Sequence, residues 1–144
     1  MPDGFQVPTA LTAGALRLEP LGPQHNDADY EAWTSSIDHI RATPGFAGRD
    51  WPAPGMTREQ NLADMRMHAE HFAARQGFTY TVLDAASREV VGCVYIYPAD
   101  RPGHDARVRS WVRADRAAQD DELRQAVRAW LAVAWPFRAV DFDR

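Results

Sequence analysis

The side chains best suited to acid–base or metal chemistry gather in the string His68-Ala-Glu-His71. Imidazole and carboxylate are metal-ligand types, but a zinc site normally needs three or four converging ligands. The spacing from Asp64 places both histidines on the side of a predicted helix opposite Met65 and Phe72. We therefore expect a solvated helix face here and no metal site.

A second set of candidates lies in the apolar, strand-like run from Val90 to Tyr97. Cys93 is the only cysteine of the sequence, which excludes a disulfide framework and favours a small buried side chain. Tyr95 and Tyr97 share its strand face, because side chains alternate along a strand. A phenol at the end of a strand could donate a proton or line a pocket. The alternative is a packed aromatic with its hydroxyl at the rim.

The run from 106 to 113 places Arg107, Arg109, Trp111 and Arg113 on one strand face. Guanidinium groups cannot sit unpaired in a dry core. Either this face opens into a groove that holds an anion, or carboxylates pair with the arginines. Ion pairing is the commoner cause and is the favoured interpretation, with these candidate partners: Asp84, Asp100, Asp105 and Asp141.

Composition excludes several classes of function. All 16 basic residues are arginine, which removes a Schiff-base lysine and a Walker lysine. The net charge of -4 argues against a nucleic-acid partner. No apolar stretch approaches the ~20 residues of a membrane span, and the first residues lack a secretory pattern. We expect a cytoplasmic protein without a membrane partner.

The 144 residues, 45% of them hydrophobic, fit one domain. Residues 1–14 predict a flexible N-terminal arm and residues 15–144 the domain. Periodicity predicts the order strand, helix, helix, strand, strand, strand, helix, strand. Hairpins followed by a crossover helix indicate an α/β (α+β) mixed sheet with helices on both faces. The expected strands cover 16–21, 78–83, 90–97, 106–113 and 138–142, and the expected helices begin near Asn26, Thr57 and Asp120.

Local signals refine two of these helices. Asn26 is placed to cap the first helix. Thr57 and Gln60 have the spacing of a capping box at the start of the second, and Gly77 is expected to end it. The predicted buried stripe of that second helix consists of Leu62, Met65, Ala69, Phe72 and Ala73.

The order of elements and several strings resemble the GNAT N-acetyltransferase superfamily, above all its ribosomal-protein N-terminal acetyltransferase branch. The resemblance covers residues 16–142, and the order of elements carries most of it. The matching strings are Leu16-Arg-Leu-Glu-Pro-Leu21, Trp51-Pro52, the helix from Thr57, Val91-Gly92-Cys-Val, Ser110-Trp111-Val112 and Trp135-Pro136-Phe137.

The resemblance implies that acetyl-CoA inserts where the strand ending at Val112 splays from its neighbour. Its pantetheine arm would pair with strand backbone, and the following loop would hold the diphosphate at a helix N-terminus, which attracts anions. It also implies an acceptor amine on a small molecule or a protein N-terminus, with Tyr97 as the candidate catalytic residue for proton transfer. The implied cofactor-binding positions are Trp111, Val112, Arg113, Arg116, Ala117, Ala118 and Gln119.

That loop departs from the family pattern Arg/Gln-x-x-Gly-x-Gly/Ala. Residues 113–122 contain no glycine, and Asp120, Asp121 and Glu122 occupy the first helical turn. We expect these carboxylates to cap the helix in place of a phosphate. A second hypothesis is therefore a catalytically silent GNAT-like module that binds a small anionic ligand or a protein partner.

The sequence also ends after its fifth expected strand, so we expect the later helix and hairpin of the family to be absent. In the family, those elements usually complete the acceptor side and supply a tyrosine acid. A third hypothesis is a homodimer in which the partner completes the sheet.

Overall fold

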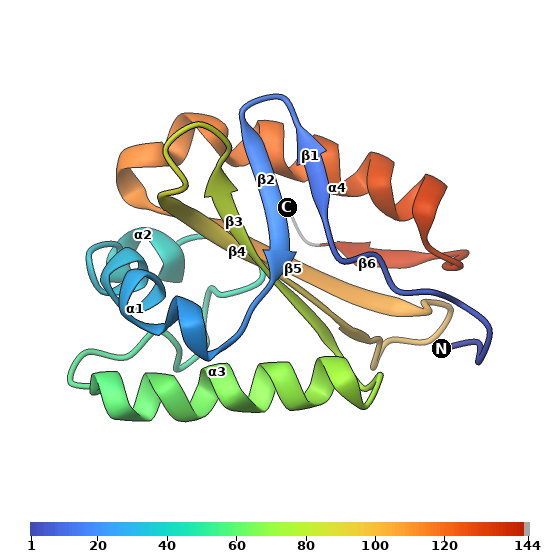
Figure 1. Cartoon of the computed structure of the whole chain (residues 1–144), viewed down its shortest axis with the longest axis horizontal. Coiled ribbons are helices and arrows are strands. Elements are labelled where there is room, and N and C mark those ends of the chain that lie inside the picture. Colours follow the sequence, from blue (N-terminus) through green and yellow to red (C-terminus); the bar gives the residue numbers. More distant parts are fainter. Residues whose placement is uncertain (143–144) are drawn as a thin grey trace.

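A mixed sheet of six strands forms the centre of the molecule (Figure 1). The structure is a computed structural model that describes residues 1–142. It confirms the predicted α/β class and the predicted order of elements, and it adds the first strand. In chain order the elements are β1 (Leu11–Ala13), β2 (Leu16–Pro20), the 3₁₀ turn η1 (Pro23–His25), α1 (Asn26–Thr34), α2 (Ile37–Arg41), α3 (Arg58–Ala73), β3 (Phe78–Asp84), β4 (Val90–Pro98), β5 (Ala106–Val112), the 3₁₀ turn η2 (Ala114–Gln119), α4 (Asp120–Ala134) and β6 (Val140–Phe142).

The strands lie side by side in the order in which they occur along the chain. Every neighbouring pair is antiparallel except β5 and β6, which run parallel. A parallel pair needs a long crossover, and α4 supplies it. β6 pairs with β5 only from Ala106↔Val140 to Val108↔Phe142. The described pairing therefore ends before the last four residues of β5.

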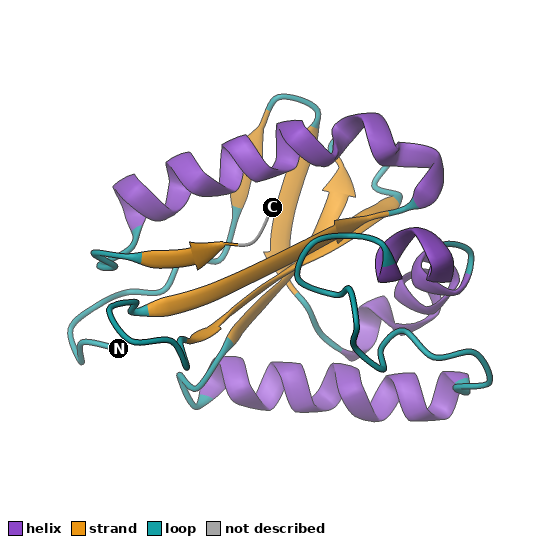
Figure 2. Cartoon of the chain, turned by 180° about the vertical axis from the view of Figure 1, so that it is seen from behind, coloured by secondary structure: helices purple, strands orange, loops and turns teal. Residues whose placement is uncertain are grey.

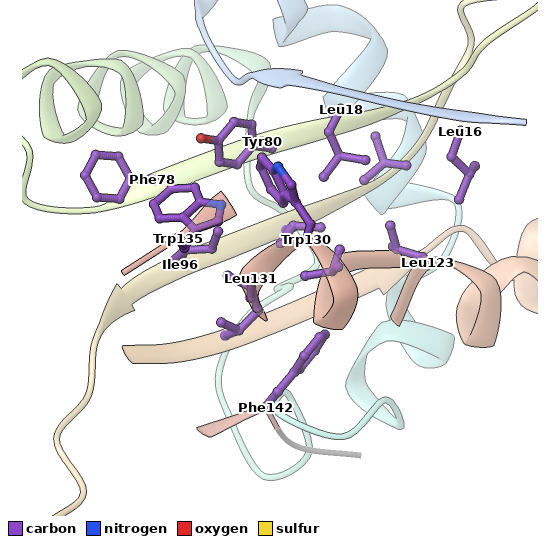
Figure 3. Close-up of a cluster of buried hydrophobic side chains, with 14 of the residues drawn as sticks. Leu16, Leu18, Phe78, Tyr80, Ile96, Leu123, Trp130, Leu131, Trp135 and Phe142 are labelled. Atoms are coloured by element: carbon purple, nitrogen blue, oxygen red, sulfur yellow. The ribbon is translucent and has the colours of Figure 1, made fainter. Parts of the chain in front are cut away.

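Helices cover both faces of this sheet, as predicted (Figure 2). α4 packs on one face, where its apolar stripe meets strand residues such as Leu18 and Tyr80. Figure 3 shows Leu123, Trp130 and Leu131 directed into this cluster. Burying each such side chain contributes about 2 kcal/mol, so this face supplies much of the stability.

The segment before β2 contacts the domain at several points. Phe5 and Val7 lie against the α4-side cluster, and the Tyr80 hydroxyl donates to the Pro8 carbonyl at 2.6 Å. β1 pairs with β2 over three residues. At its other end, the domain expected over 15–144 runs two residues beyond the described part.

Within residues 1–142, no helix is both long enough and apolar enough to cross a bilayer.

The first predicted helix is divided. The turn η1 leads directly into α1, and α2 follows after Ser35 and Ser36. The prediction that Asn26 caps this helix is wrong, because Asn26 is already the first residue of α1 and His25 precedes it as the cap. The capping box at the start of α3 is confirmed, since Gln60 N donates to Thr57 Oγ1 at 3.1 Å and Thr57 N donates to Gln60 Oε1 at 2.8 Å.

The start of α4 also differs from expectation. Gln119 is the cap residue and makes no side-chain capping bond, so the expected capping by carboxylates is wrong. A capping side chain needs extended backbone before the helix, whereas η2 delivers the chain in a helical conformation. Asp120 Oδ2 instead accepts a bond of 3.0 Å from Nε of Arg124, whose side chain is only 2% exposed.

We predict that Asp120→Asn lowers the free energy of unfolding by about 2 kcal/mol, because it removes one charge partner of a buried guanidinium. The matched control is Glu122→Gln in the same helical turn, where the side chain is exposed and the expected change stays under about 1 kcal/mol. Urea denaturation of both variants measures the difference. Equal losses would show that the helix terminus, rather than Arg124, accounts for the effect.

Candidate functional site

A cavity of about 370 Å³ lies on the sheet face covered by α1, α2 and α3. The loop between α2 and α3 contributes Phe46, Arg49 and Trp51 to its wall, and Tyr95 of β4 adds a third aromatic ring. The remaining lining is rich in ionisable side chains, which come from α1, α3, β4 and β5: Asp29, Asp64, His68, His71, Tyr97 and Arg109.

The inner face of α3 is the predicted one only in part: Met65 and Phe72 point inward as expected, and polar residues share this face. The residues that point inward are Asn61, Met65, His68 and Phe72, so the expectation of solvated histidines is wrong. Residues three or four apart on a helix share a face, and His68 stands three after Met65 and four before Phe72. Ala73, expected inside, is exposed. Polar side chains therefore occupy two positions of the buried stripe.

The Tyr97 hydroxyl lies between two imidazoles. Its oxygen is 3.1 Å from Nδ1 of His68 and 2.9 Å from Nδ1 of His71. Nδ1 of His68 is also 3.1 Å from Thr79 Oγ1. One phenol carries one hydrogen, so it can donate to one ring nitrogen while it accepts from the other. The two rings then hold complementary tautomers.

Burial favours the uncharged forms of His68 and Tyr97. Desolvation, helped by the neighbouring His71, lowers the pKa of His68 to about 4. Desolvation also raises the pKa of Tyr97 above its usual value. Gly77 is needed here for close approach, because a Cβ at this position would overlap the Tyr97 ring. α3 has already ended at Ala73, so the prediction that Gly77 ends this helix is wrong.

A second polar group joins α1 to α3 through the side-chain amide of Asn61. Its oxygen accepts from Trp33 Nε1 at 3.0 Å. Its nitrogen donates to Asn26 Oδ1 at 2.9 Å and to Asp29 Oδ2 at 3.3 Å. The Asp29 carboxylate is thereby held at the cavity wall.

Asp29 is buried, at 3% exposure, and burial raises its pKa to about 6. The bond from Asn61 opposes this shift, and the nearby charge of Asp64 adds to it. Sequence reasoning did not single out Asp29 as a site residue. The sequence does indicate that Asp29 faces inward. It stands four residues before the apolar Trp33, so the two side chains share one face of the helix.

The strand faces of β4 and β5 agree with the predicted alternation. Cys93 is buried and faces the same side as Tyr95, and burial raises its thiol pKa well above the usual value. Trp111 Nε1 donates to the Tyr95 hydroxyl at 2.9 Å.

The arginines of β5 support the ion-pair interpretation. Arg107 lies 3.8 Å from Asp100, one of the predicted partners. Arg113 pairs at 2.7 Å with Asp115, which was not predicted. The other expected carboxylates interact elsewhere: Asp84 with Arg116, Asp141 with Arg101, and Asp105 with the backbone amides of Arg138 and Ala139.

The predicted cofactor positions lie at the end of β5 and along η2. The side chains of Trp111 and Val112 are buried, so neither is available to a ligand. Arg113 N donates to Val91 O at 2.8 Å. Because peptide groups alternate in an antiparallel pair, those of Ser110 and Val112 face away from β4, towards the edge beyond the β6 pairing.

In η2, the guanidinium of Arg116 contacts Asp84 at 3.3 Å, Glu89 at 3.2 Å and the Gln119 side chain at 3.1 Å. Ala117 and Ala118 are exposed. The arginines at positions 113 and 116 are thus each paired with carboxylates of this chain.

Comparison with solved structures shows which fold this is. A ribosomal-protein-S5-alanine acetyltransferase from Vibrio fischeri superposes with a TM-score of 0.66 at 14% identity, covering 86% of this chain and 67% of that one. The chain has the GNAT fold. A GnaT-family acetyltransferase from Bordetella pertussis matches at 0.60 and 22% identity, over 87% of this chain and 71% of that one.

The microcin C7 self-immunity acetyltransferase MccE, solved with acetyl-CoA and AMP, matches this GNAT-fold chain with a TM-score of 0.65 at 10% identity. That match covers 90% of this chain and 71% of MccE. The chain spans about two thirds of the length of such structures, 65% in the case of an acetyltransferase from Vibrio cholerae. No protein-family model matches the sequence, and no curated protein matches it.

We predict that Asp29→Asn steepens the pH dependence of stability. The raised pKa of Asp29, about 6 against 3.8, destabilises the fold as pH rises through that window, because the native state then binds more protons than the unfolded state. The lowered pKa of His68, about 4 against 6.5, has the opposite sign. Each pKa shift corresponds to about 3 kcal/mol in the free energy of unfolding, so the two effects largely cancel in the wild-type chain.

In Asp29→Asn only the His68 effect remains, and stability should climb clearly between pH 4 and pH 6.5. The control is Asp27→Asn, an exposed acid of the same helix. Thermal and urea unfolding across this range measure both. Parallel curves for the wild type and Asp29→Asn would contradict the buried-acid account.

Proposed function

We propose that the protein transfers an acetyl group from acetyl-CoA to a primary amine of a small molecule or a protein N-terminus. The observation that carries this proposal is the His68–Tyr97–His71 cluster, which lines a cavity bordered by β5 in a GNAT fold. Solved structures of this fold include acetyltransferases. The cavity would receive the amine, and the open edge of β5 would face the acetyl donor.

The edge of β5 suits the pantetheine arm of CoA. Beyond Val108 the described β6 no longer pairs with β5, and the peptide groups of Ser110 and Val112 are directed towards that edge. An extended amide chain can add to such an edge by backbone hydrogen bonds. The groups that would hold CoA are therefore the peptide groups of Ser110 and Val112.

The following loop does not suit the diphosphate in the way the family pattern implies. Arg113 and Arg116 are paired with carboxylates of the chain, and Asp120, Asp121 and Glu122 add negative charge in the first turn of α4. Two like charges about 5 Å apart repel by roughly 3 kcal/mol at an effective dielectric near 20. Tight diphosphate binding would require these side chains to rearrange.

The chain's own residues can handle the proton that an ammonium must lose before its nitrogen attacks. A neutral imidazole has one ring nitrogen free to accept a proton, although the lowered pKa of His68, about 4, makes this ring a weak base at neutral pH. The Tyr97 hydroxyl connects the two rings. A proton gained by one imidazole can therefore shift through this hydroxyl to the other.

The carboxylates around η2 and the first turn of α4 favour a second candidate function. If the carboxylates around η2 exclude CoA, the cavity remains as the ligand site of a catalytically silent GNAT-like module. Such a module would bind a small molecule or a protein partner without turnover. Binding of acetyl-CoA separates the two candidates.

We predict that acetyl-CoA binds with a Kd below about 1 mM at near-physiological salt, as measured by calorimetry. The double variant Asp121→Asn and Glu122→Gln should tighten this binding about threefold, because it removes two screened negative charges near the diphosphate. Asp120 is left intact in this design because it pairs with Arg124. No heat up to several millimolar would remove the transferase proposal.

We predict that Tyr97→Phe lowers kcat about 100-fold while the KM for the amine changes little, since the variant removes only the hydroxyl between the imidazoles. Tyr80→Phe is the matched control, because its hydroxyl bonds to Pro8 on the other side of the sheet. A steady-state acetylation assay with an amine panel measures both variants. An unchanged kcat would assign Tyr97 to packing alone.

A further inference from the structure

Asp29 presents an uncompensated negative charge to the cavity. Its side chain is almost fully buried and lines the wall, and Asn61 Nδ2, a neutral donor, lies 3.3 Å from its carboxylate. Among the ion pairs of residues 1–142, none includes Asp29. Burying a carboxylate is costly unless a cation meets it.

Three aromatic rings form another part of the same cavity. Phe46 and Trp51 have ring centroids 5.8 Å apart, and Tyr95 lies 6.0 Å from the first and 6.4 Å from the second. Such a wall packs against flat apolar groups, and ring faces also attract cations. Met65 of α3 adds a polarizable apolar contact.

The other charged groups of the cavity divide into two sets. Asp64 of α3 lies near enough to raise the pKa of Asp29, so the α1–α3 end is negative. Arg49 is exposed and donates to Gly45 O at 3.0 Å, and Arg109 enters from β5. His68 and His71 stand between α3 and Tyr97. A cation would therefore be drawn to the end formed by the two helices.

The size of the cavity favours a small molecule over a polypeptide end. Its volume of about 370 Å³ equals roughly twelve water molecules at their liquid volume, near the lower end of small-molecule sites. One ring with a short aminoalkyl chain fits this space. The following residues of a protein N-terminus would extend beyond it.

We infer that Asp29 binds the ammonium group of a small primary amine whose aromatic ring packs against Phe46, Trp51 and Tyr95. The inference names the acceptor class of the proposed transferase and rests on that function only for calling this amine a substrate. Recognition itself needs no acetyl donor. The site selects for a molecule that carries an ammonium group next to an aromatic ring.

Calorimetric titration of the full chain with 2-phenylethylamine and with 2-phenylethanol tests this inference. The two probes share the ring and chain and differ in charge. We expect the wild type to bind the amine at least tenfold more tightly than the alcohol. Asp29→Asn should remove that preference, whereas Asp27→Asn, an exposed acid of the same helix, should keep it.

Asp29→Asn keeps the shape of the side chain and an oxygen that can accept from Asn61, and thermal unfolding verifies its fold. Trp51→Leu is the second variant, and we expect it to weaken both probes by similar factors. Equal affinity of the wild type for amine and alcohol, or an amine preference that survives Asp29→Asn, overturns the inference.

An acetylation assay with 2-phenylethylamine and a short peptide separates this inference from the proposed function. Binding of the amine that depends on Asp29, without acetylation of either compound, contradicts the transferase and upholds the binding site. Acetylation of the peptide without binding of the amine upholds the transferase and overturns the acceptor class.

Discussion

The side-chain amide of Asn61 is the contact on which the candidate site depends. Its oxygen and nitrogen are both used, by Trp33 on one side and by Asn26 and Asp29 on the other. A buried amide that loses one of these partners leaves another polar group unsatisfied, at a cost of about 1–3 kcal/mol. The spacing between α1 and α3, and with it the cavity, therefore depends on this buried polar side chain.

The two faces of the sheet have different roles, one in stability and one in forming the cavity. The α4 face is a cluster of aromatic and aliphatic side chains, which stabilises the fold. The opposite face buries an acid and an imidazole whose pKa values are displaced in opposite directions. Displaced pKa values of this kind gather where a protein binds or transforms a ligand. Stability from one layer offsets the strain of charge burial in the other.

Much of the scaffold follows from local patterns in the sequence. Alternation along β4 and β5 places Cys93, Tyr95 and Trp111 on one face, and the Thr57 box begins α3, because both signals depend on neighbouring residues alone. The site depends on non-local partners. His68 lies inside only because Tyr97 and Thr79 of the sheet satisfy its ring.

The inner stripe of α3 was misassigned in part for that reason, since polar residues at 61 and 68 do not register as buried in an apolar pattern. Arg116 of η2 likewise finds its carboxylates, Asp84 and Glu89, on β3 and in the β3–β4 turn. Neither set of contacts has a signature in the spacing of the sequence.

The glycine beneath the Tyr97 ring has a consequence for how the proton network is maintained. The phenol rests directly on the main chain where the segment after α3 turns into β3. Even one methyl group there would lift the ring off its support and tilt its oxygen away from the imidazoles. The acid–base character of the cavity thus depends on a residue that carries no functional group.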